Sequence, residues 1–238
     1  MGILGRDFMK KHVLALSVLG TVLSFSAHAG KDPLESINRP IFAFNHMLDT
    51  AIITPVTKGY KFITPDFAER GIDNFFNNLY TPTVIVNQLL QGKPKEALQS
   101  TSRLAFNSTI GIGGLFDVAS SGGIPKYNED FGQTLGHWGV GQGPYIVLPV
   151  FGPTTLRDGA GRIADRMTHP ITYVQDNDDH HRLFIGSVIN ARAQVMGMET
   201  FVTGEKYEFM RDAYLQRREY LVNDAEVGSE DPFLDEIE

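Results

Sequence analysis

One run of side chains has the types and spacing of a metal site. The run Asp176-Asn177-Asp178-Asp179-His180-His181 combines carboxylates with imidazoles, both of which bind metal ions. It lacks the glycine that an EF-hand loop carries at its sixth position. Acidic residues that enter a helix complement the helix dipole. We therefore expect this run to cap a helix, and we predict no metal.

A second candidate for chemistry is His137, which lies beside Trp138 in a glycine-rich segment. An imidazole there can act as a general base. No carboxylate stands at a recognisable spacing from it, so a structural or pore-lining histidine is the stronger interpretation. The charged groups of Arg157-Asp158, and of Arg162 with Asp165-Arg166, are most simply ion pairs on or between helices.

Motifs of the common enzyme classes are absent from the sequence. It contains no G-x-G-x-x-G, P-loop, H-E-x-x-H or G-x-S-x-G. The glycines 139, 141 and 143 fail the dinucleotide spacing, because Pro144 stands where the third glycine should fall. We predict no cofactor and no enzymatic activity.

The N-terminal residues have the pattern of a secretory signal. Lys10 and Lys11 precede an apolar run from Val13 to Phe25, and Ala27-His28-Ala29 follows. A basic region, a short apolar core and an A-x-A site are typical of a cleaved export signal. Residues 1–29 are therefore interpreted as a signal peptide, and the remaining 238 − 29 = 209 residues suffice for one domain over residues 30–223.

Amino-acid composition excludes several further classes of protein function. The sequence has no cysteine, which excludes disulfides, thiol nucleophiles and thiolate metal sites. No basic stripe of the kind that nucleic-acid binders carry is present. Residues 224–238 hold seven acidic side chains and no basic one, which predicts a solvated, disordered acidic tail.

The elements that must position these groups are mostly helices. Four helix starts are marked by proline, at Asp32-Pro33-Leu34-Glu35, Thr64-Pro65, Thr81-Pro82 and Lys93-Pro94. Pro40 is expected to bend or restart the first helix. Two further helices are predicted near the C-terminus, one with an apolar stripe from Phe184 to Val202 and one from about Glu205 to Val222.

The middle of the chain follows another pattern. Thirteen glycines lie between Gly111 and Gly161, which makes long regular helix there unlikely and favours tight turns. Tyr145 to Val150 is predicted to form one brief strand. The apolar helix faces elsewhere suit either an ordinary core or helices that lie in a membrane interface with some faces against lipid. Composition alone does not choose between these two.

Ordered strings along the chain resemble the MlaA/VacJ family. They include Asp32-Pro33-Leu34-Glu35 with Phe42-Ala43-Phe44-Asn45, Gly114-Leu115-Phe116-Asp117, and the run from Phe131 to Gly141 that continues through Gly143-Pro144-Tyr145. The resemblance covers about residues 32–222. It implies an all-α fold, a ring-shaped bundle of amphipathic helices with a glycine-rich hairpin and a central amphipathic pore.

The same resemblance implies a function in lipid transport. Family members remove mislocalised phospholipids from the outer leaflet of the Gram-negative outer membrane, beside a trimeric porin, and pass them to a periplasmic phospholipid-binding protein of the Mla system. It also implies a location on the periplasmic side of the outer membrane. By resemblance, Ile41, Phe44 and Asn45 line the pore. The expected gating hairpin comprises Gly139, Gly141 and Gly143 with Trp138 and Tyr145.

Two departures from the family pattern stand out. Family members usually carry a lipidated cysteine at the cleavage site, where this chain has Ala29-Gly30, and Ala43 stands where relatives often have a polar side chain. Two alternatives to lipid transport remain, a periplasmic scaffold that docks on a porin without moving lipid, and a phospholipid hydrolase.

Overall fold

The computed structural model describes residues 32–198 and 204–224, and the predicted signal peptide and all of the predicted acidic tail except Asp224 lie outside them. Its helices are α2 (Glu35–Leu48), α3 (Thr54–Ile63), α4 (Asp66–Leu90), α5 (Pro94–Thr109), α6 (Val118–Ser121), α7 (Phe131–His137), α8 (Leu156–Asp165), α9 (Asn177–Gln194) and α10 (Lys206–Val222). A π-helical turn (Asp49–Ile53) joins α2 to α3, and a 3-10 turn (Pro170–Tyr173) precedes α9. Two strands, β1 (Tyr145–Leu148) and β2 (Gly152–Thr155), complete the described fold.

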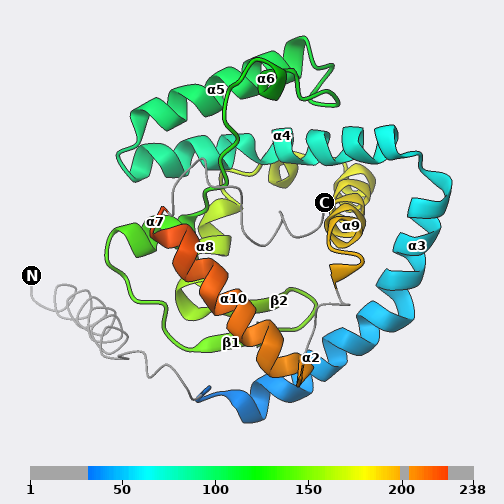
Figure 1. The fold of residues 1–238 in the computed structure, drawn as a ribbon, viewed down its shortest axis with the longest axis vertical. Coiled ribbons are helices and arrows are strands. Elements are labelled where there is room, and N and C mark those ends of the chain that lie inside the picture. Colours follow the sequence, from blue (N-terminus) through cyan, green and yellow to red (C-terminus); the bar gives the residue numbers. More distant parts are fainter. Residues whose placement is uncertain (1–31, 199–203, 225–238) are drawn as a thin grey trace, which may run out of the picture.

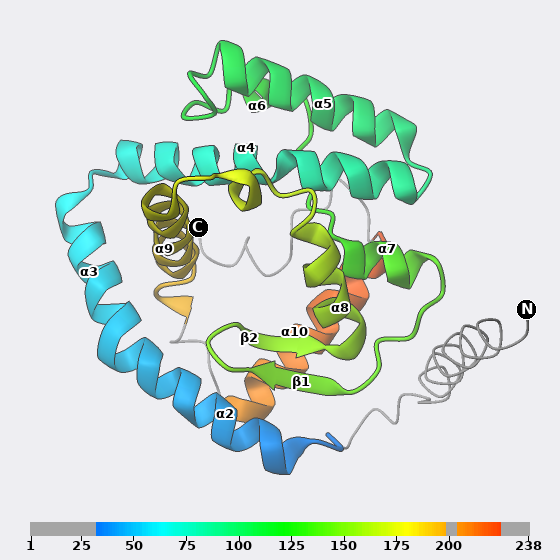
Figure 2. The ribbon, with the colours of Figure 1, turned by 180° about the vertical axis from the view of Figure 1, so that it is seen from behind.

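These helices form a ring, as the resemblance to the MlaA/VacJ family implied (Figure 1). α2, the π-helical turn and α3 make one curved side, α4 closes the side opposite, and α5 with α6 packs on the outside of α4. α9 lies within the curve of α3, and α10 crosses the β-hairpin (Figures 1 and 2). No described helix is long and apolar enough to cross a membrane.

The first helix begins later than expected and passes through its proline. Asp32 accepts a hydrogen bond from Leu34 N at 2.9 Å, so a turn precedes the helical start at Glu35. Glu35 forms an ion pair with Arg39, one turn further along the helix. The helix does not restart at Pro40, which lies within α2.

The predicted helix start at Thr81-Pro82 is wrong, because α4 runs unbroken from Asp66 to Leu90 with Pro82 inside it. Proline removes one backbone donor, here the one that would bond to the Asn78 carbonyl, while side chains beside it make other contacts. Thr81 Oγ1 donates to the Asn77 carbonyl at 3.0 Å, and Asn78 Nδ2 reaches Ser108 Oγ of α5 at 3.0 Å. Packing along α5 thus keeps the helix straight through its proline. The starts predicted at Pro65 and Pro94 are confirmed.

The C-terminal helices agree in part with the prediction. α10 starts directly after Glu205, whose side chain accepts from Glu208 N. Asp176 caps α9 by accepting from the amides of Asp178 and Asp179, at 2.9 and 3.1 Å. The apolar stripe does not define the packed face of α9, which ends at Gln194 and buries Asn190 and Ala193. Val202 lies outside the described residues.

A small apolar core lies where α2, the β-hairpin and α10 meet. It consists of Tyr145, Val147 and Tyr207, with Ile41, Phe42, Tyr214 and Leu215 packed against it. The ring of Phe42 stands edge-on to that of Tyr207, with 5.5 Å between the centroids. This core ties the first helix to the last one and holds the hairpin between them.

Candidate functional site

The β-hairpin is the element that enters the ring. β1 and β2 pair antiparallel, with Tyr145 opposite Thr155 and Leu148 opposite Gly152. Its tip, residues 149–151, points toward the middle of the ring, whereas the connection from α7 to β1 runs along the outer edge (Figures 1 and 2). The candidate site is therefore the hairpin and the helices that hold it.

The glycine segment Gly139–Gly143 does not form this hairpin, contrary to expectation. It leads from α7 into β1, and the hairpin turn follows it at residues 149–151. Backbone with positive φ occurs at Val150 (69°) and Gly152 (75°), as well as at Gly139 (86°) and Gly143 (70°). A three-residue hairpin loop needs such a conformation near its end, and a valine supplies one of the two here. Glycine density therefore pointed to the wrong turn.

Two asparagines of α2 pair with the free edge of β1. Asn38 donates to the Tyr145 carbonyl at 3.0 Å and accepts from Val147 N at 2.9 Å. Asn45 donates to the Leu148 carbonyl at 2.9 Å and accepts from Val150 N at 2.7 Å. Each side-chain amide thus acts as a peptide group of a neighbouring strand would.

Helix and strand spacing explain why these two residues match one edge. Asn38 and Asn45 are seven residues apart, which is about 10.5 Å along a helix and places them on one face. The carbonyls of Tyr145 and Leu148, which the two asparagines bind, are three residues apart in β1, about 10 Å along a strand. These two spacings match, so Asn38 and Asn45 on one face of α2 can bond to both ends of β1.

A buried network of charges lies behind the hairpin. Arg218 of α10 donates to Asp130 at 2.9 Å and to Asp158 at 3.0 Å, and Arg157 Nε reaches Asp158 at 2.9 Å. Although burial opposes the charged form, the hydrogen bond and charge of Arg218 lower the pKa of Asp130. Burial likewise opposes the charge of Arg218, yet Asp130 and Asp158 raise its pKa. The pairs are thus internal ties between α7, α8 and α10.

Arg162 and Asp165, for which an ion pair was predicted, have other hydrogen-bond partners. Asp165 accepts from Asn87 Nδ2 at 3.0 Å and from Phe131 N at 3.0 Å, and burial raises its pKa to about 6. Arg162 instead binds backbone of the hairpin, donating to the carbonyls of Phe151 at 3.4 Å and Pro153 at 2.9 Å. Arg162 therefore links α8 to the turn and the second strand of the hairpin.

The predicted site residues fall into separate places. Asn45 contacts the hairpin, and Ile41 packs on the core that holds it. Phe44 is 44% exposed, on the side of α2 that also presents Ile37 and Met47. His137 is exposed at the end of α7.

The residues assigned to the gating hairpin are also spread apart. Trp138 Nε1 donates to the Leu90 carbonyl at 3.1 Å, and the side chain of Trp138 is half exposed. Tyr145 is buried in the core, and burial raises its pKa. Gly141 has ordinary φ and open space around it, whereas a Cβ on Gly143 would lie 3.0 Å from Leu156 Cβ.

Sequence reasoning missed Asn38, Arg162, Val150 and Phe151 as parts of this site. Their partners are backbone atoms far along the chain, which no local pattern shows. One signal was present: two asparagines spaced seven residues apart, and so on one face of the first helix.

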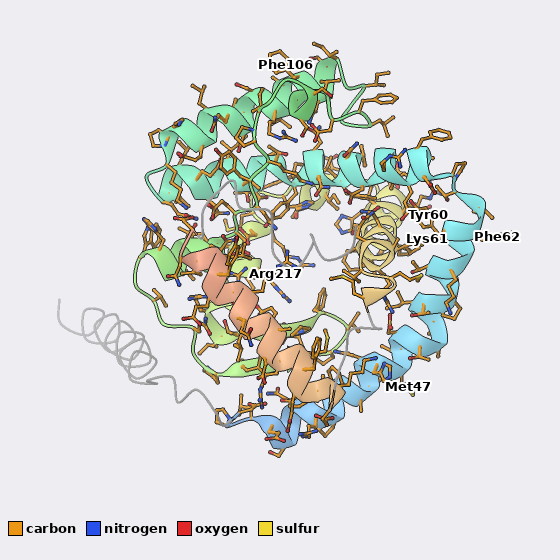
Figure 3. All side chains as sticks on the ribbon, viewed as in Figure 1. Met47, Tyr60, Lys61, Phe62, Phe106 and Arg217 are labelled. Carbon is orange, nitrogen blue, oxygen red and sulfur yellow. The ribbon has the colours of Figure 1, made fainter. Side chains whose placement is uncertain are left out.

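Polar and apolar side chains are distributed inside out. Among the described residues, twenty polar or charged side chains are buried and only seven apolar ones. Large apolar side chains are exposed instead, including Phe62 at 90%, Ile63 at 77% and Phe67 at 72%. Met47, Phe62 and Phe106 point away from the ring, while Tyr60, Lys61 and Arg217 point to its inner side (Figure 3).

Fold and site together define a helical ring with an apolar exterior and a polar interior. The chain belongs to the MlaA lipoprotein family, whose model matches residues 30–221.

Named relatives agree with this assignment. The Escherichia coli intermembrane phospholipid transport system lipoprotein MlaA is 34% identical over 232 residues, covering 92% of each chain. The protein of the same name from Haemophilus influenzae is 30% identical, covering 87% of this chain and 85% of the relative. An uncharacterised Rickettsia prowazekii protein is 39% identical over 80% of this chain and 78% of its own.

A solved structure is similar as well. It is reported as the structural basis for maintenance of bacterial outer membrane lipid asymmetry. The TM-score is 0.72 at 35% identity, over 81% of this chain and 100% of that chain. The named relatives thus place the family in an intermembrane phospholipid transport system.

Proposed function

We propose that this chain removes mislocalised phospholipids from the outer leaflet of a bacterial outer membrane. It lies in the inner leaflet, on the periplasmic side, and the headgroup passes through the opening of the ring. The lipid is then taken up by a periplasmic phospholipid-binding protein. The proposal needs no chemical step on the lipid.

The inside-out burial pattern carries this proposal. A water-soluble domain buries its large apolar side chains and leaves few exposed apolar patches. Here the outer faces carry Phe62, Ile63 and Phe67, while asparagines, threonines and ion pairs fill the interior. Lipid is the solvent that such an exterior suits. Since no described helix is both long and apolar enough to cross a membrane, the helices are proposed to lie in the interface plane.

A polar interior supplies what a moving headgroup needs. Transfer of a charged or polar group into hydrocarbon without partners costs several kcal/mol. A ring that is polar inside and apolar outside keeps the headgroup among polar groups while its acyl chains remain in lipid. Arg217, which extends toward the middle of the ring, is one cationic side chain on this path (Figure 3).

The roles proposed from the family resemblance are adjusted to this geometry. Ile41, Phe44 and Asn45 of α2 are proposed to border the opening. Gly139 and Gly143 have positive φ at the two ends of the glycine segment, and we assign this segment the role of hinge at the base of the hairpin. Gly141, Trp138 and Tyr145 support it, the last as a buried anchor.

Attachment and partners follow from the same surfaces. Relatives are named lipoproteins, but the 238 residues contain no cysteine to carry acyl chains. We propose that the apolar outer faces, together with contact to a trimeric porin, hold this chain at the membrane.

Deletion of the gene tests the function. Outer-leaflet phosphatidylethanolamine, measured with an amine reagent that does not cross the membrane, should rise in the deletion strain and return to normal on complementation. A chain that only docks on a porin would leave this quantity unchanged in the deletion strain while still co-purifying with the porin. That outcome would favour the scaffold alternative.

A further inference from the structure

One helical stretch on the curved side of the ring contains an extra residue. α2, the π-helical turn and α3 follow one another without a break, and the backbone stays helical at both junctions of the turn. Five turns of a regular α-helix take about 18 residues, so such a helix would place Val56 on the same face as the buried Asn38. The structure buries Thr57 instead, at 0% exposed, and leaves Val56 49% exposed. The π-helical turn has therefore absorbed one residue.

This extra residue decides which face of α3 points out of the ring. The large apolar side chains Val56, Phe62 and Ile63 are exposed. Thr57 is buried, and Lys61 points to the inner side of the ring (Figure 3). Each residue of an α-helix adds about 100° of rotation. A regular helix from α2 onward would thus turn α3 by about 100°, which would bring Val56 inward and carry Thr57 off the buried face.

The side chains at the two ends of the π-helical turn meet. Thr54 N donates to the Asp49 carbonyl, five residues back, which is the hydrogen bond that defines a π-helix. This bond places the two residues over one another, and Thr54 Oγ1 donates to Asp49 Oδ2 at 3.2 Å. In a regular α-helix, five residues would separate them by about 140° around the axis. The pairing of these two side chains is therefore specific to the π-helical turn.

Arg192 of α9 binds both of these side chains at once. Its Nε donates to Asp49 Oδ1 at 2.7 Å, and its Nη2 donates to Asp49 Oδ2 at 3.1 Å and to Thr54 Oγ1 at 3.2 Å. The side chains of Arg192 and Asp49 are only 13% and 27% exposed. Although burial opposes the charged form, the hydrogen bond and charge of Arg192 lower the pKa of Asp49. A planar guanidinium fixes the positions of its acceptors, so this contact favours the π-helical turn over a regular helix.

A π-helical turn within an α-helix is uncommon, and such turns are frequent at functional sites. We propose that Arg192 is a positioning residue for lipid passage: it holds the π-helical turn through Asp49 and Thr54, and so directs the polar face of α3 to the opening and the apolar face to lipid. Without this contact, residues 35–63 relax into one regular α-helix with α3 turned by about 100°. The inference rests on the proposed function, which supplies the lipid on the outside and the headgroup on the inside.

Thiol reactivity at two neighbouring positions measures which face of α3 is buried. The 238 residues contain no cysteine, so Val56→Cys and Thr57→Cys each carry a single thiol. In the full chain in detergent, a maleimide should react quickly at position 56 and slowly at position 57. Adding Arg192→Gln should slow the first reaction and speed the second, each by about tenfold. Arg182→Gln, an exposed change on the same helix, should alter neither. Faster reaction at both positions, as local unfolding gives, or no change at either, would overturn the proposal.

Deletion of Ala51 supplies a rescue that a merely structural arginine would not allow. Ala51 is an exposed residue of the π-helical turn, and its removal takes out the extra residue. A regular α-helix then presents the same faces as the parent chain. Combined with Arg192→Gln, the deletion should restore fast reaction at position 56 and slow reaction at position 57, in the parent numbering. If Arg192→Gln alone fails to fold, the deletion should also restore the helical circular dichroism. Failure of the deletion to restore either property would overturn the proposal.

Outer-leaflet phospholipid, measured with the same amine reagent, connects the π-helical turn to function. At normal protein level, Arg192→Gln should raise it relative to Arg182→Gln, and the added deletion of Ala51 should bring it back down. Normal asymmetry in Arg192→Gln together with reversed thiol reactivity would overturn the role in lipid passage. If deletion of the whole gene also leaves asymmetry normal, the proposed function fails instead, and the thiol reactivities still report on the helix.

Discussion

Asn38→Ala is the substitution whose cost follows most directly from the structure. It removes the partners of the Tyr145 carbonyl and the Val147 amide, in residues that are 4% and 1% exposed. A buried backbone group left without a partner costs about 1–3 kcal/mol. Two of them give a loss of about 2–6 kcal/mol, a large share of the roughly 5–15 kcal/mol that stabilises a typical domain. Asp32, which also accepts from Asn38, keeps its hydrogen bond from Leu34 N, so loss of the Asn38 contact there adds little.

Chemical unfolding in mild detergent measures this loss. Trp138 is the only tryptophan and reports on the region beside α7, while circular dichroism follows the helices. The matched control is Asn74→Ala, which removes one accessible bond to the Leu115 carbonyl and should cost about 0.5 kcal/mol. If Asn38→Ala is no more destabilising than Asn74→Ala, the pairing of α2 with the strand edge is not what holds the hairpin.

Three further outcomes are expected. Gly143→Cys with Leu156→Cys should form a disulfide: a Cβ on Gly143 would lie 3.0 Å from Leu156 Cβ, a small opening reaches the roughly 3.5–4.5 Å that a disulfide spans, and the 238 residues contain no other cysteine. If the glycine segment is a hinge, the oxidised protein loses function in the asymmetry assay and reductant restores it. Equal activity in both states argues against a hinge. Burial raises the pKa of Asp165 to about 6 in the folded protein, from an ordinary value of 3.8, so the free energy of unfolding should fall by about 2–3 kcal/mol as the pH rises from about 4 to 6. Asp165→Asn should remove this part of the pH dependence of urea unfolding. Identical pH dependence in the two proteins would contradict the prediction. Phe62→Asp with Ile63→Asp should weaken vesicle flotation at least about tenfold, since each exposed apolar side chain contributes roughly 1.5–3 kcal/mol on insertion; unchanged flotation would place this face in water.

Punctuation by proline and glycine predicted much of the helical ring. Pro65 and Pro94 stand at true helix starts, where the missing N–H of proline costs no hydrogen bond within the helix. Pro82 misled because α4 packs along α5, where Asn78 bonds to Ser108, and this packing outweighs the one backbone bond that proline removes. A local signal fails where packing against a second element outweighs it.

The site was harder to predict for a related reason. The glycine segment drew attention to residues 139–143, yet the turn inside the ring is made at Val150, a residue that sequence rules exclude from positive φ. Its conformation is imposed by Asn45, more than a hundred residues away in the chain. The family resemblance identified α2 and the glycine segment as important but not the contact between α2 and the strand that follows.

Passage of the headgroup through the ring is tested most directly by a phospholipid that carries a photoreactive group on its headgroup. The full chain is illuminated in membranes containing this lipid, and the crosslinked peptides are identified by mass spectrometry. We predict crosslinks on the inner side of the ring, at the hairpin tip 149–151 and on the part of α10 that holds Arg217. Crosslinks confined to the outer faces, around Phe62 and Phe106, would contradict the account.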